Sequence, residues 1–518
     1  MGKIFAAVDV GSYEIGMKIF EILDRNGMKE LDYVRRRIEL GTDTYHTGKI
    51  SYERMDELCA ILKDFTHVME TYQAKEYRAC GTSAIRETEN TQMILDQIRL
   101  RTGLNVEVLS NSEQRFLNYK SVALRGEKFN KFIEDGTAFL DIGGGSLQVS
   151  LFQKSSLVTT QNIRLGILRI REELVNLKAK TTHYESLIEE LIDNEMHIFR
   201  KLYLNDMHIS NLIIVDDYIS YIMKKVGGGM NVDMITGEQY LGFVDHLKTK
   251  APELIAKELG IPSDNSSLLL PSAILIKHFV ESTRANLIWM PGVSLSDGIA
   301  YDYAERQKLI KSSHNFDADI ISSAKNISKR YRGSSSREET LSQVALCVFD
   351  SMKKLHGLGK RERLLLQIAS RLQDCGKYIS ITDVAECSFH IIMSTEIIGL
   401  SHMESEIVAY SVRNSYLGYL DYDELMAESE IDRDAYLVVA KLTAILRAAA
   451  GLVGNRKKAY RKVKAVIKEK ELIITVDTDM DLTLEKGFFP DRTDLFEEVF
   501  GIRPVVKKLK HKGSVKKI

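Results

Sequence analysis

Three consecutive glycines directly behind a short apolar segment limit how this chain can fold. Residues 137–140 read Thr-Ala-Phe-Leu and are followed by Asp141-Ile-Gly-Gly-Gly-Ser146. This pattern predicts a buried strand that ends in a tight turn. Consecutive glycines let the backbone approach an anion closely and direct several N–H groups towards it. We therefore interpret Gly143, Gly144, Gly145 and Ser146 as a phosphate-binding turn; the alternative is a purely structural turn.

Two side chains beside this turn determine which chemistry it supports. The carboxylate of Asp141 is suited to hold a hydrated cation next to the anion, so we predict it as a metal ligand. Gln148 stands where a carboxylate would be needed to act on water. An amide forms hydrogen bonds but cannot accept a proton at pH 7. The sequence therefore predicts phosphate binding and leaves catalysis open.

A second acidic-glycine turn lies near the N-terminus. Ile4–Val10 has the pattern of a buried strand, Asp9-Val-Gly-Ser12 that of a turn, and Met17–Leu23 that of a returning strand. Tyr33–Leu40 has the pattern of a third strand. The same strand–turn–strand pattern recurs at residues 137–152. Two such turns facing each other across a cleft are typical of the actin, hexokinase and heat-shock ATPase fold. We therefore predict an α/β fold with two actin/ribonuclease-H-like (ASKHA) lobes, in which Asp9, Gly11 and Ser12 bind phosphate.

The pattern changes after about Asp302. From Phe316 to Leu452 nearly every segment has the spacing of an amphipathic helix, and Leu472–Val476 then has that of a strand. We predict lobe I at 1–130, lobe II at 131–305, an all-α domain at 306–455 and a small α+β domain at 456–518. The lysine-rich end of the last domain either contacts a polyanion or is a solvated tail.

The bulk composition excludes little. A formal net charge of −1 gives no global preference for nucleic acid or membranes. Five scattered cysteines fit a reducing compartment. We find no apolar run that approaches the length of a membrane span. These features predict a cytoplasmic protein that does not use a membrane.

Taken in order, the motifs resemble those of the exopolyphosphatase/guanosine pentaphosphate phosphohydrolase (Ppx/GppA) family. Besides the two turns, the resemblance rests on Arg37-Ile-Glu-Leu-Gly41, Thr47-Gly-Lys-Ile-Ser51, Thr82-Ser-Ala-Ile-Arg86, Val106-Glu-Val-Leu-Ser110, Leu165-Gly166 and Val293-Ser-Leu-Ser-Asp-Gly298. The helical part resembles the HD-like third domain of the family through Leu355-His-Gly-Leu-Gly359 and Gln373-Asp374-Cys-Gly376. Phe500-Gly-Ile-Arg-Pro504 resembles the small fourth domain of its long members.

The resemblance implies cleavage of terminal phosphates from polyphosphate or pppGpp, with Mg²⁺, in the cleft between the first two lobes. It also implies a homodimer. It favours Arg86 as a phosphate-binding residue, since a guanidinium matches phosphate geometry; the alternative is a surface ion pair with Glu87 or Glu89.

The two water-activating glutamates of the family align with Gln114 and Gln148. Both are amides here, and the loss of a general base typically lowers a rate by about 10²–10⁴-fold. Glu113 is a candidate for a displaced base. One residue along a helix turns a side chain by about 100°, however, so a solvated position for Glu113 is favoured.

Two further departures affect the expected ligands. After the strand Leu212–Val215, the family has a glycine pair that accepts phosphate or nucleoside, whereas this chain has Asp216-Asp217-Tyr218. Nucleotide binding at that place is therefore less expected. The HD dyad of the helical domain reads Gln373-Asp374, and a lone Asp374 does not assemble a metal site.

Three functions remain open at this point. The chain is a slow phosphatase with a rearranged site, a non-catalytic sensor of polyphosphate or (p)ppGpp, or a kinase, against which Asp216-Asp217-Tyr218 argues. We favour the architecture and the ligand class of the phosphatase family, polyphosphate or a phosphorylated guanine nucleotide. Hydrolysis is expected to be weak or absent.

Overall fold

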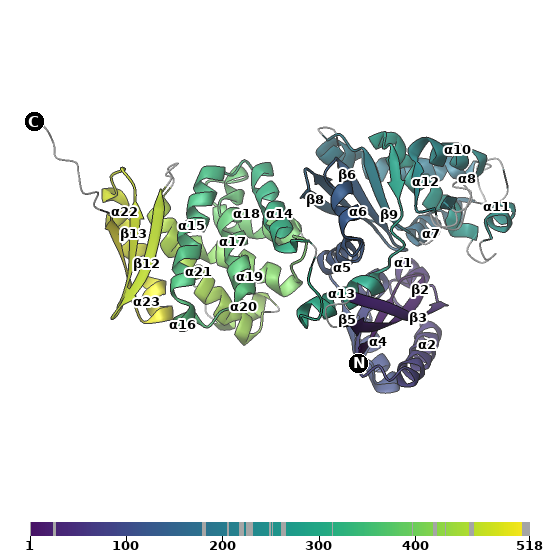
Figure 1. The fold of residues 1–518 in the computed structure, drawn as a ribbon, viewed down its shortest axis with the longest axis horizontal. Coiled ribbons are helices and arrows are strands. Elements are labelled where there is room, and N and C mark those ends of the chain that lie inside the picture. The colour runs from purple at the N-terminus through teal and green to yellow at the C-terminus, as the bar shows by residue number, and fades with distance from the viewer. Residues whose placement is uncertain are drawn as a thin grey trace, which may run out of the picture. The chain divides into compact units, whose positions relative to one another are not determined.

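The computed structural model describes residues 2–23, 27–178, 183–204, 207–216, 222–223, 232–247, 250, 252–260, 266–312, 314–395, 397–417, 422–429, 431–454 and 460–509 (Figure 1). The chain divides into two compact units, Met1–Asn315 and Phe316–Ile518. The lysine-rich end from 510 onwards and the pair Asp217-Tyr218 lie outside the described residues.

The first sheet of unit 1 has the strand order β3-β2-β1-β4-β5. Strands β1 (Lys3–Val10), β2 (Glu14–Leu23) and β3 (Gly27–Arg37) are antiparallel, whereas β4 (Glu76–Gly81) and β5 (Val106–Val108) continue the sheet in parallel. The helices between these strands and the next sheet are α1 (Leu40–Thr47), α2 (Tyr52–Thr71), α3 (Ser83–Glu87), α4 (Thr91–Thr102), α5 (Asn111–Ala123) and α6 (Glu127–Phe132).

The second sheet repeats this topology. Strands β6 (Thr137–Ile142), β7 (Leu147–Gln153) and β8 (Ser156–Ile163) are antiparallel, β9 (Asn211–Val215) and β11 (Leu287–Trp289) follow in parallel, and β10 (Met234–Thr236) adds an antiparallel edge. If the edge strand β10 is left out, both sheets follow the order 3-2-1-4-5 when counted from β1 and from β6. In the two hairpins Asp9 pairs with Gly16 and Asp141 pairs with Gln148. The predicted duplication of the strand–turn–strand hairpin is confirmed.

Alternation along β6 and β7 divides their side chains between two faces of the sheet. Ala138, Leu140, Leu147 and Val149 are fully buried in the hydrophobic core of this lobe. The helices that follow are α7 (Ile167–Lys178), α8 (Tyr184–Phe199), a π turn (Arg200–Leu204), α10 (Gly237–Leu247), α11 (Pro252–Leu259) and α12 (Ser266–Thr283). Asp141 and Gln148 lie on the other face, where α5 packs. The last helix, α13 (Leu295–Arg306), packs on β1, β2 and α5, so the chain returns to the first sheet.

Unit 2 combines helices with a three-stranded sheet. Its helices are α14 (Phe316–Arg330), α15 (Ser335–Ser351), α16 (Lys353–His356), α17 (Lys360–Leu372), η3 (Cys375–Tyr378), α18 (Val384–Thr395), α19 (His402–Leu417), α20 (Tyr422–Glu428) and α21 (Arg433–Val453). The sheet has the order β12 (Lys462–Lys468), β13 (Glu471–Asp477), β14 (Arg503–Lys508). Between β13 and β14 lie α22 (Thr483–Phe488), η4 (Pro490–Arg492) and α23 (Asp494–Phe500).

The sequence showed no apolar run that approaches the length of a membrane span, but one helix of unit 2 has that length and apolar character. Among the described residues, α21 is the helix long and apolar enough to cross a membrane. Its apolar window is 67% buried within the protein, which is the environment of a core helix.

Two elements differ from their prediction. The sequence placed a third strand at Tyr33–Leu40, but β3 ends at Arg37, where its pairing with β2 ends at Glu14. Glu39 then adopts a left-handed φ of 52° and precedes α1. The charged stretch 455–470 contains the strand β12, which the sequence analysis missed because lysines on an exposed edge strand hide the strand pattern.

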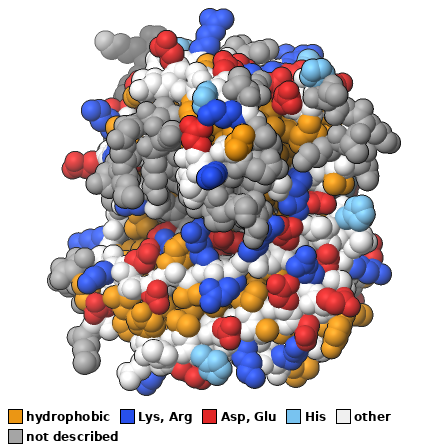
Figure 2. Space-filling model, turned by 90° about the vertical axis from the view of Figure 1, so that its right-hand side faces the viewer, with side chains coloured by type: hydrophobic (Ala, Val, Ile, Leu, Met, Phe, Trp, Pro, Cys, Tyr) orange, Lys and Arg blue, Asp and Glu red, His pale blue; other side chains and the backbone are white. Residues whose placement is uncertain are grey.

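The surface agrees with the near-zero net charge. On the face shown in Figure 2, basic and acidic side chains are interspersed rather than gathered by sign.

Candidate functional site

The two hairpin turns meet in unit 1. A Cβ atom built on Gly144 would lie 3.2 Å from the Cβ of Ser12, closer than an ordinary van der Waals contact, so the missing side chain at Gly144 lets the turns of the two sheets approach each other. The hydroxyl of Ser12 also hydrogen-bonds to Ser83 Oγ at 2.7 Å and to the Tyr45 hydroxyl at 2.8 Å. The structure therefore brings the predicted residues Gly11, Ser12 and Gly143–Ser146 to one place.

The glycine turn is held by its carbonyl oxygens. Gly143 N donates to Ser146 O, and the carbonyls of Gly143 and Gly144 accept hydrogen bonds from backbone N–H groups at the start of α7. Gly145 O accepts a hydrogen bond from Arg169 Nε at 2.9 Å. Among the described residues, no recorded hydrogen bond uses the N–H groups of Gly144 and Gly145. These groups are available to an anion, as a phosphate-binding turn requires.

Tyr45 explains why position 145 is glycine. A Cβ atom there would lie 1.9 Å from the Tyr45 hydroxyl, which is far inside contact distance. Burial raises the pKa of Tyr45, so this hydroxyl stays protonated and hydrogen-bonds to Ser12 and Ser83. Nothing in the sequence pattern signalled Tyr45.

A cavity of about 150 Å³ lies at the junction of the two turns. At about 30 Å³ of liquid volume per water, it has room for roughly five waters, or one phosphate group with a few of them. Of the predicted site residues, Asp9, Gly11, Ser12, Gln114, Asp141, Gly143, Gly144 and Ser146 line it. Arg86, Glu113, Gly145 and Gln148 do not.

The lining of this cavity is acidic. It contains the carboxylates of Asp9, Glu14, Asp141 and Asp216, and among the described residues it contains no lysine, arginine or histidine. A phosphate entering it therefore needs a cation for charge balance. Mg²⁺ is typically held by one or two carboxylates together with phosphate oxygens and waters. Asp9 and Asp141, at the ends of β1 and β6, fit that donor set.

Helix α5 presents two amides towards the glycine turn. Gln114 lines the cavity, and Asn118, one turn later, donates a hydrogen bond from Nδ2 to the Asp141 carboxylate. Gln114 Oε1 accepts from Arg86 Nη1 at 3.4 Å, and the same Nη1 donates to Leu109 O at 2.6 Å. Arg86 is therefore held at the end of β5 beside the cavity. Asn118 was not among the predicted site residues, although its spacing of four residues from Gln114 was a usable signal.

The structure gives Glu113 a different role from the displaced base or the solvated residue considered from the sequence. Its carboxylate accepts hydrogen bonds from Ser110 N at 3.0 Å and Ser110 Oγ at 2.8 Å, and Ser110 Oγ accepts from Glu113 N. This capping box fixes the start of α5. Glu113 is half-buried rather than solvated, and it is not placed to act on water in the cavity.

Gln148 lies behind the glycine turn. It pairs in register with Asp141 on β6 and with Asn162 on β8, and it is buried. Neither its Oε1 nor its Nε2 has a hydrogen-bond partner among the described residues. A buried polar atom without a partner typically costs about 1–3 kcal/mol. Such a residue is expected where a bound group completes the hydrogen bonding.

Two ion pairs connect the two lobes. Arg171 on α7 lies 2.9 Å from the Glu39 carboxylate, and Arg169 lies 2.6 Å from that of Glu87. Burial alone would raise the pKa of Glu39, but hydrogen bonds from Arg171 and Arg37 outweigh it and lower the pKa to about 2. The carboxylate thus stabilises contact between the lobes.

Glu39→Gln is expected to lower the free energy of unfolding at pH 7 by roughly 2–3 kcal/mol. Because the folded-state pKa of Glu39 lies below its ordinary value, its contribution is complete above pH 4.5 and is lost as the pH falls towards 2. Urea unfolding at pH 7 and pH 3 measures both effects. Glu89→Gln, at the exposed pair with Lys49, is the matched control and should change little. An equal loss for Glu39→Gln at both pH values would contradict the assignment.

Comparisons with known proteins identify the family to which this fold belongs. The family model described as the Ppx/GppA phosphatase family matches residues 19–307, and the one described as Ppx/GppA phosphatase, domain III, matches residues 321–497. The chain belongs to the Ppx/GppA phosphatase family. Its fold is accordingly α/β, with two actin-like ASKHA lobes followed by domain III.

Ppx/GppA relatives differ in how much of their length this chain spans. The guanosine-5'-triphosphate,3'-diphosphate pyrophosphatase of Vibrio atlanticus is 19% identical and aligns over 94% of this chain and 93% of its own length. The bifunctional 3-dehydroquinate synthase/phosphatase of Fusobacterium nucleatum is 22% identical over 51% of this chain and 38% of its own length. Exopolyphosphatase 1 of Mycobacterium tuberculosis is 23% identical over 36% and 54%. The chain thus spans about half or less of two of these relatives.

Solved structures show the same fold. An exopolyphosphatase from Cytophaga hutchinsonii has a TM-score of 0.52 and 19% identity, covering 60% of this chain and 100% of its own. The Ppx/GppA family member of Aquifex aeolicus has a TM-score of 0.50 and 18% identity, covering 59% and 98%.

Proposed function

We propose that this Ppx/GppA member binds the terminal phosphate of polyphosphate or of a phosphorylated guanine nucleotide, together with Mg²⁺, in the cavity between the lobes. Hydrolysis of that phosphate is weak or absent. The observation that carries the proposal is the junction of the two hairpin turns, with Gln114 at the cavity and Gln148 beside Asp141.

Binding rests on hydrogen-bond donors of the two turns. The N–H group of Gly144 and the hydroxyls of Ser12 and Ser146, which line the cavity, are suited to donate hydrogen bonds to a phosphate group. Bound Mg²⁺ would neutralise charge on the phosphate, and Asp9 and Asp141 would hold it. The small cavity fits one terminal phosphate, so the rest of the ligand lies outside it.

Weak hydrolysis follows from the amides. Gln114 can hold a water at the cavity through its amide, but it cannot take a proton from that water at neutral pH. Gln148 is equally unable to act as a base. The site therefore retains orientation of a water and lacks its deprotonation.

The test combines binding and phosphate release. Long-chain polyphosphate, pppGpp, ppGpp and ATP are titrated calorimetrically with and without Mg²⁺, and released phosphate is measured in parallel. We expect Mg²⁺-dependent binding of polyphosphate or a guanine nucleotide, with little release. Asp141→Asn should abolish the Mg²⁺ dependence, whereas Asp135→Asn, at an exposed position just before β6, should not. No binding of any of the four ligands would overturn the proposal.

A slow phosphatase is the second candidate, because two other carboxylates line the cavity. Asp216 Oδ2 accepts a hydrogen bond from Ser272 Oγ at 3.0 Å, and Glu14 Oε1 accepts one from Arg35 at 3.4 Å. If the protein releases phosphate, Asp216→Asn and Glu14→Gln identify the base. A release rate that both variants leave unchanged removes this candidate.

Cellular location and assembly complete the proposal. We infer a cytoplasmic protein, since its five free cysteines fit a reducing compartment, and a homodimer, as the family resemblance implies. Light scattering of the purified protein tests the dimer.

A further inference from the structure

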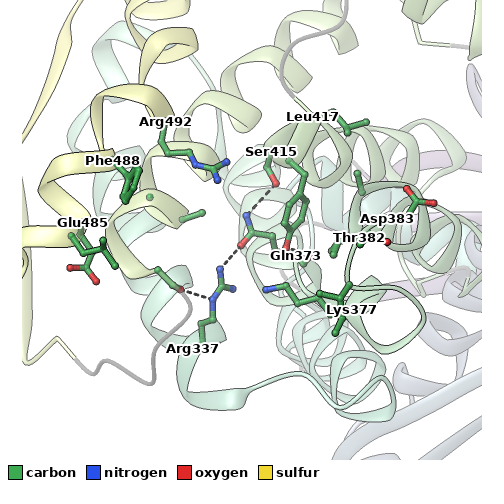
Figure 3. Close-up of a pocket in the computed structure, with 18 residues that line it drawn as sticks. Arg337, Gln373, Lys377, Thr382, Asp383, Ser415, Leu417, Glu485, Phe488 and Arg492 are labelled. Atoms are coloured by element: carbon green, nitrogen blue, oxygen red, sulfur yellow. Dashed lines mark hydrogen bonds between the residues drawn. The ribbon is translucent and has the colours of Figure 1, made fainter.

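We propose that unit 2 contains a second, separate ligand site, which binds a small organic anion with an apolar body. The site is a cavity of about 780 Å³ at the dyad Gln373-Asp374 (Figure 3). This size lies within the range of about 300–1,000 Å³ that is typical of small-molecule sites. The proposal does not depend on the function proposed for unit 1.

Metal binding at this dyad is blocked by the protein itself. Arg337 Nη1 lies 2.7 Å from Asp374 Oδ2, and Lys377 Nζ lies 3.1 Å from Asp374 Oδ1. The Tyr416 hydroxyl donates to Asp374 Oδ1 at 2.6 Å. Burial, and after it the charge of Asp374, raises the pKa of Tyr416, so this donor stays protonated. Two cations and a phenol thus occupy the carboxylate that a metal would need.

A polar floor results from the same contacts. Gln373 Oε1 accepts from Arg337 Nη2 at 3.2 Å, Gln373 Nε2 donates to Ser415 Oγ at 3.2 Å, and Arg337 Nε donates to Gly454 O at 2.8 Å. All three side chains are buried. Because each is fixed by a neighbour, the floor is preorganised, which lowers the cost of ligand binding.

Arg492 supplies the charge that selects an anion. It lies on η4 and lines the cavity, and in Figure 3 its guanidinium points towards the amide of Gln373. The described residues include no recorded hydrogen bond or ion-pair partner for this guanidinium. Gly451 of α21 permits its position, since a Cβ atom there would lie 2.9 Å from Arg492 Cβ. A cation aimed at a fixed polar floor is suited to a carboxylate or a phosphate monoester.

Apolar side chains form the rest of the wall. Ile381, Leu417, Leu484 and Phe488 line the cavity and are 84%, 62%, 56% and 61% exposed, which is unusual for large apolar residues. A ligand with an aliphatic or aromatic body would cover them and gain hydrophobic free energy.

Acidic residues at the cavity exclude highly charged ligands. Asp383 and Glu485 line it, and in Figure 3 the carboxylate of Glu485 points away from Gln373. Asp374 balances only one of the two charges of Arg337 and Lys377, so these two residues and Arg492 together leave two positive charges to balance a ligand. Polyphosphate carries too many charges for this balance, so the two units select different anions.

The experiment is calorimetric titration of the full chain with GMP and with octanoate, and with inorganic phosphate and polyphosphate as references. GMP pairs a phosphate monoester with an aromatic body, and octanoate pairs a carboxylate with an aliphatic one. We expect one of the two to bind with a Kd below about 1 mM. The Arg492→Glu variant should weaken this binding roughly ten- to hundredfold.

Two variants sharpen the test. Ala450→Leu, at a half-buried position on the cavity wall, should abolish binding by filling space. Arg503→Glu, at an exposed arginine of β14, is the matched control and should bind like the unchanged protein. Thermal melting checks that each variant folds. If Ala450→Leu does not fold, the Arg492→Glu variant alone tests the proposal. Failure of both GMP and octanoate to bind, or binding that Arg492→Glu leaves intact, would overturn the proposal.

Discussion

Exchanging both amides for acids, Gln114→Glu with Gln148→Glu, is expected to raise Mg²⁺-dependent phosphate release from polyphosphate by about 10²–10⁴-fold. The exchange keeps size and shape and supplies proton acceptors. Gln114 already lines the cavity, so an acid there reaches a water beside the bound phosphate. Gln148 lies in register with Asp141, so an acid there acts next to the proposed metal ligand.

The single change Gln148→Glu is expected to carry a cost in stability that Mg²⁺ relieves. A carboxylate at this buried position beside Asp141 is disfavoured by desolvation and by like charge, and its pKa should be raised. A divalent cation between the two carboxylates offsets both effects. Melting temperatures with Mg²⁺ and with EDTA measure the difference. Gln153→Glu, on the same strand but exposed, is the matched control.

The outcome separates two explanations of weak hydrolysis. If the double variant releases phosphate and the control does not, the amides account for the loss. If the double variant binds polyphosphate, keeps its fold and still releases nothing above the Gln153→Glu control, the alignment of the two positions with water-activating acids is wrong.

Local sequence was sufficient to predict the framework of this site. Both hairpins were visible because an apolar strand followed by acid and glycine is a pattern of adjacent residues. Asp9, Ser12, Asp141 and Gly143 therefore came out at the cavity. The interpretation of Gln114 as an amide at the position of a water-activating acid also rests on local sequence, the motif around Ser110, and it stays a prediction.

Contacts between distant segments could not be predicted in this way. Tyr45 touches Gly145 across a hundred residues, and the Glu39–Arg171 pair joins two lobes. Such contacts depend on how the lobes pack, and no periodicity encodes them. Glu113 shows the converse limit, because the same residue types that suit a base also suit a capping box.

Gly166→Ala is expected to abolish phosphate binding and to lower the free energy of unfolding by roughly 1–3 kcal/mol. A Cβ atom at this position would lie 2.2 Å from Gly144 O and 2.3 Å from Gly145 C. Both atoms belong to the backbone of the glycine turn, which cannot move aside as a flexible side chain would. The methyl group therefore displaces the N–H group proposed to hold phosphate.

A second glycine provides a control variant, for which we expect stability to rise rather than fall. Gly242 in α10 is exposed, and a Cβ atom built on it meets nothing within 4 Å. Gly242→Ala should stabilise the helix by up to about 1 kcal/mol and leave phosphate binding unchanged. Calorimetric titration with polyphosphate and denaturant unfolding of both variants measure the two quantities. The methyl group of Gly166→Ala must displace the backbone of the glycine turn. Unchanged polyphosphate binding by this variant would therefore show that the glycine turn does not hold the phosphate.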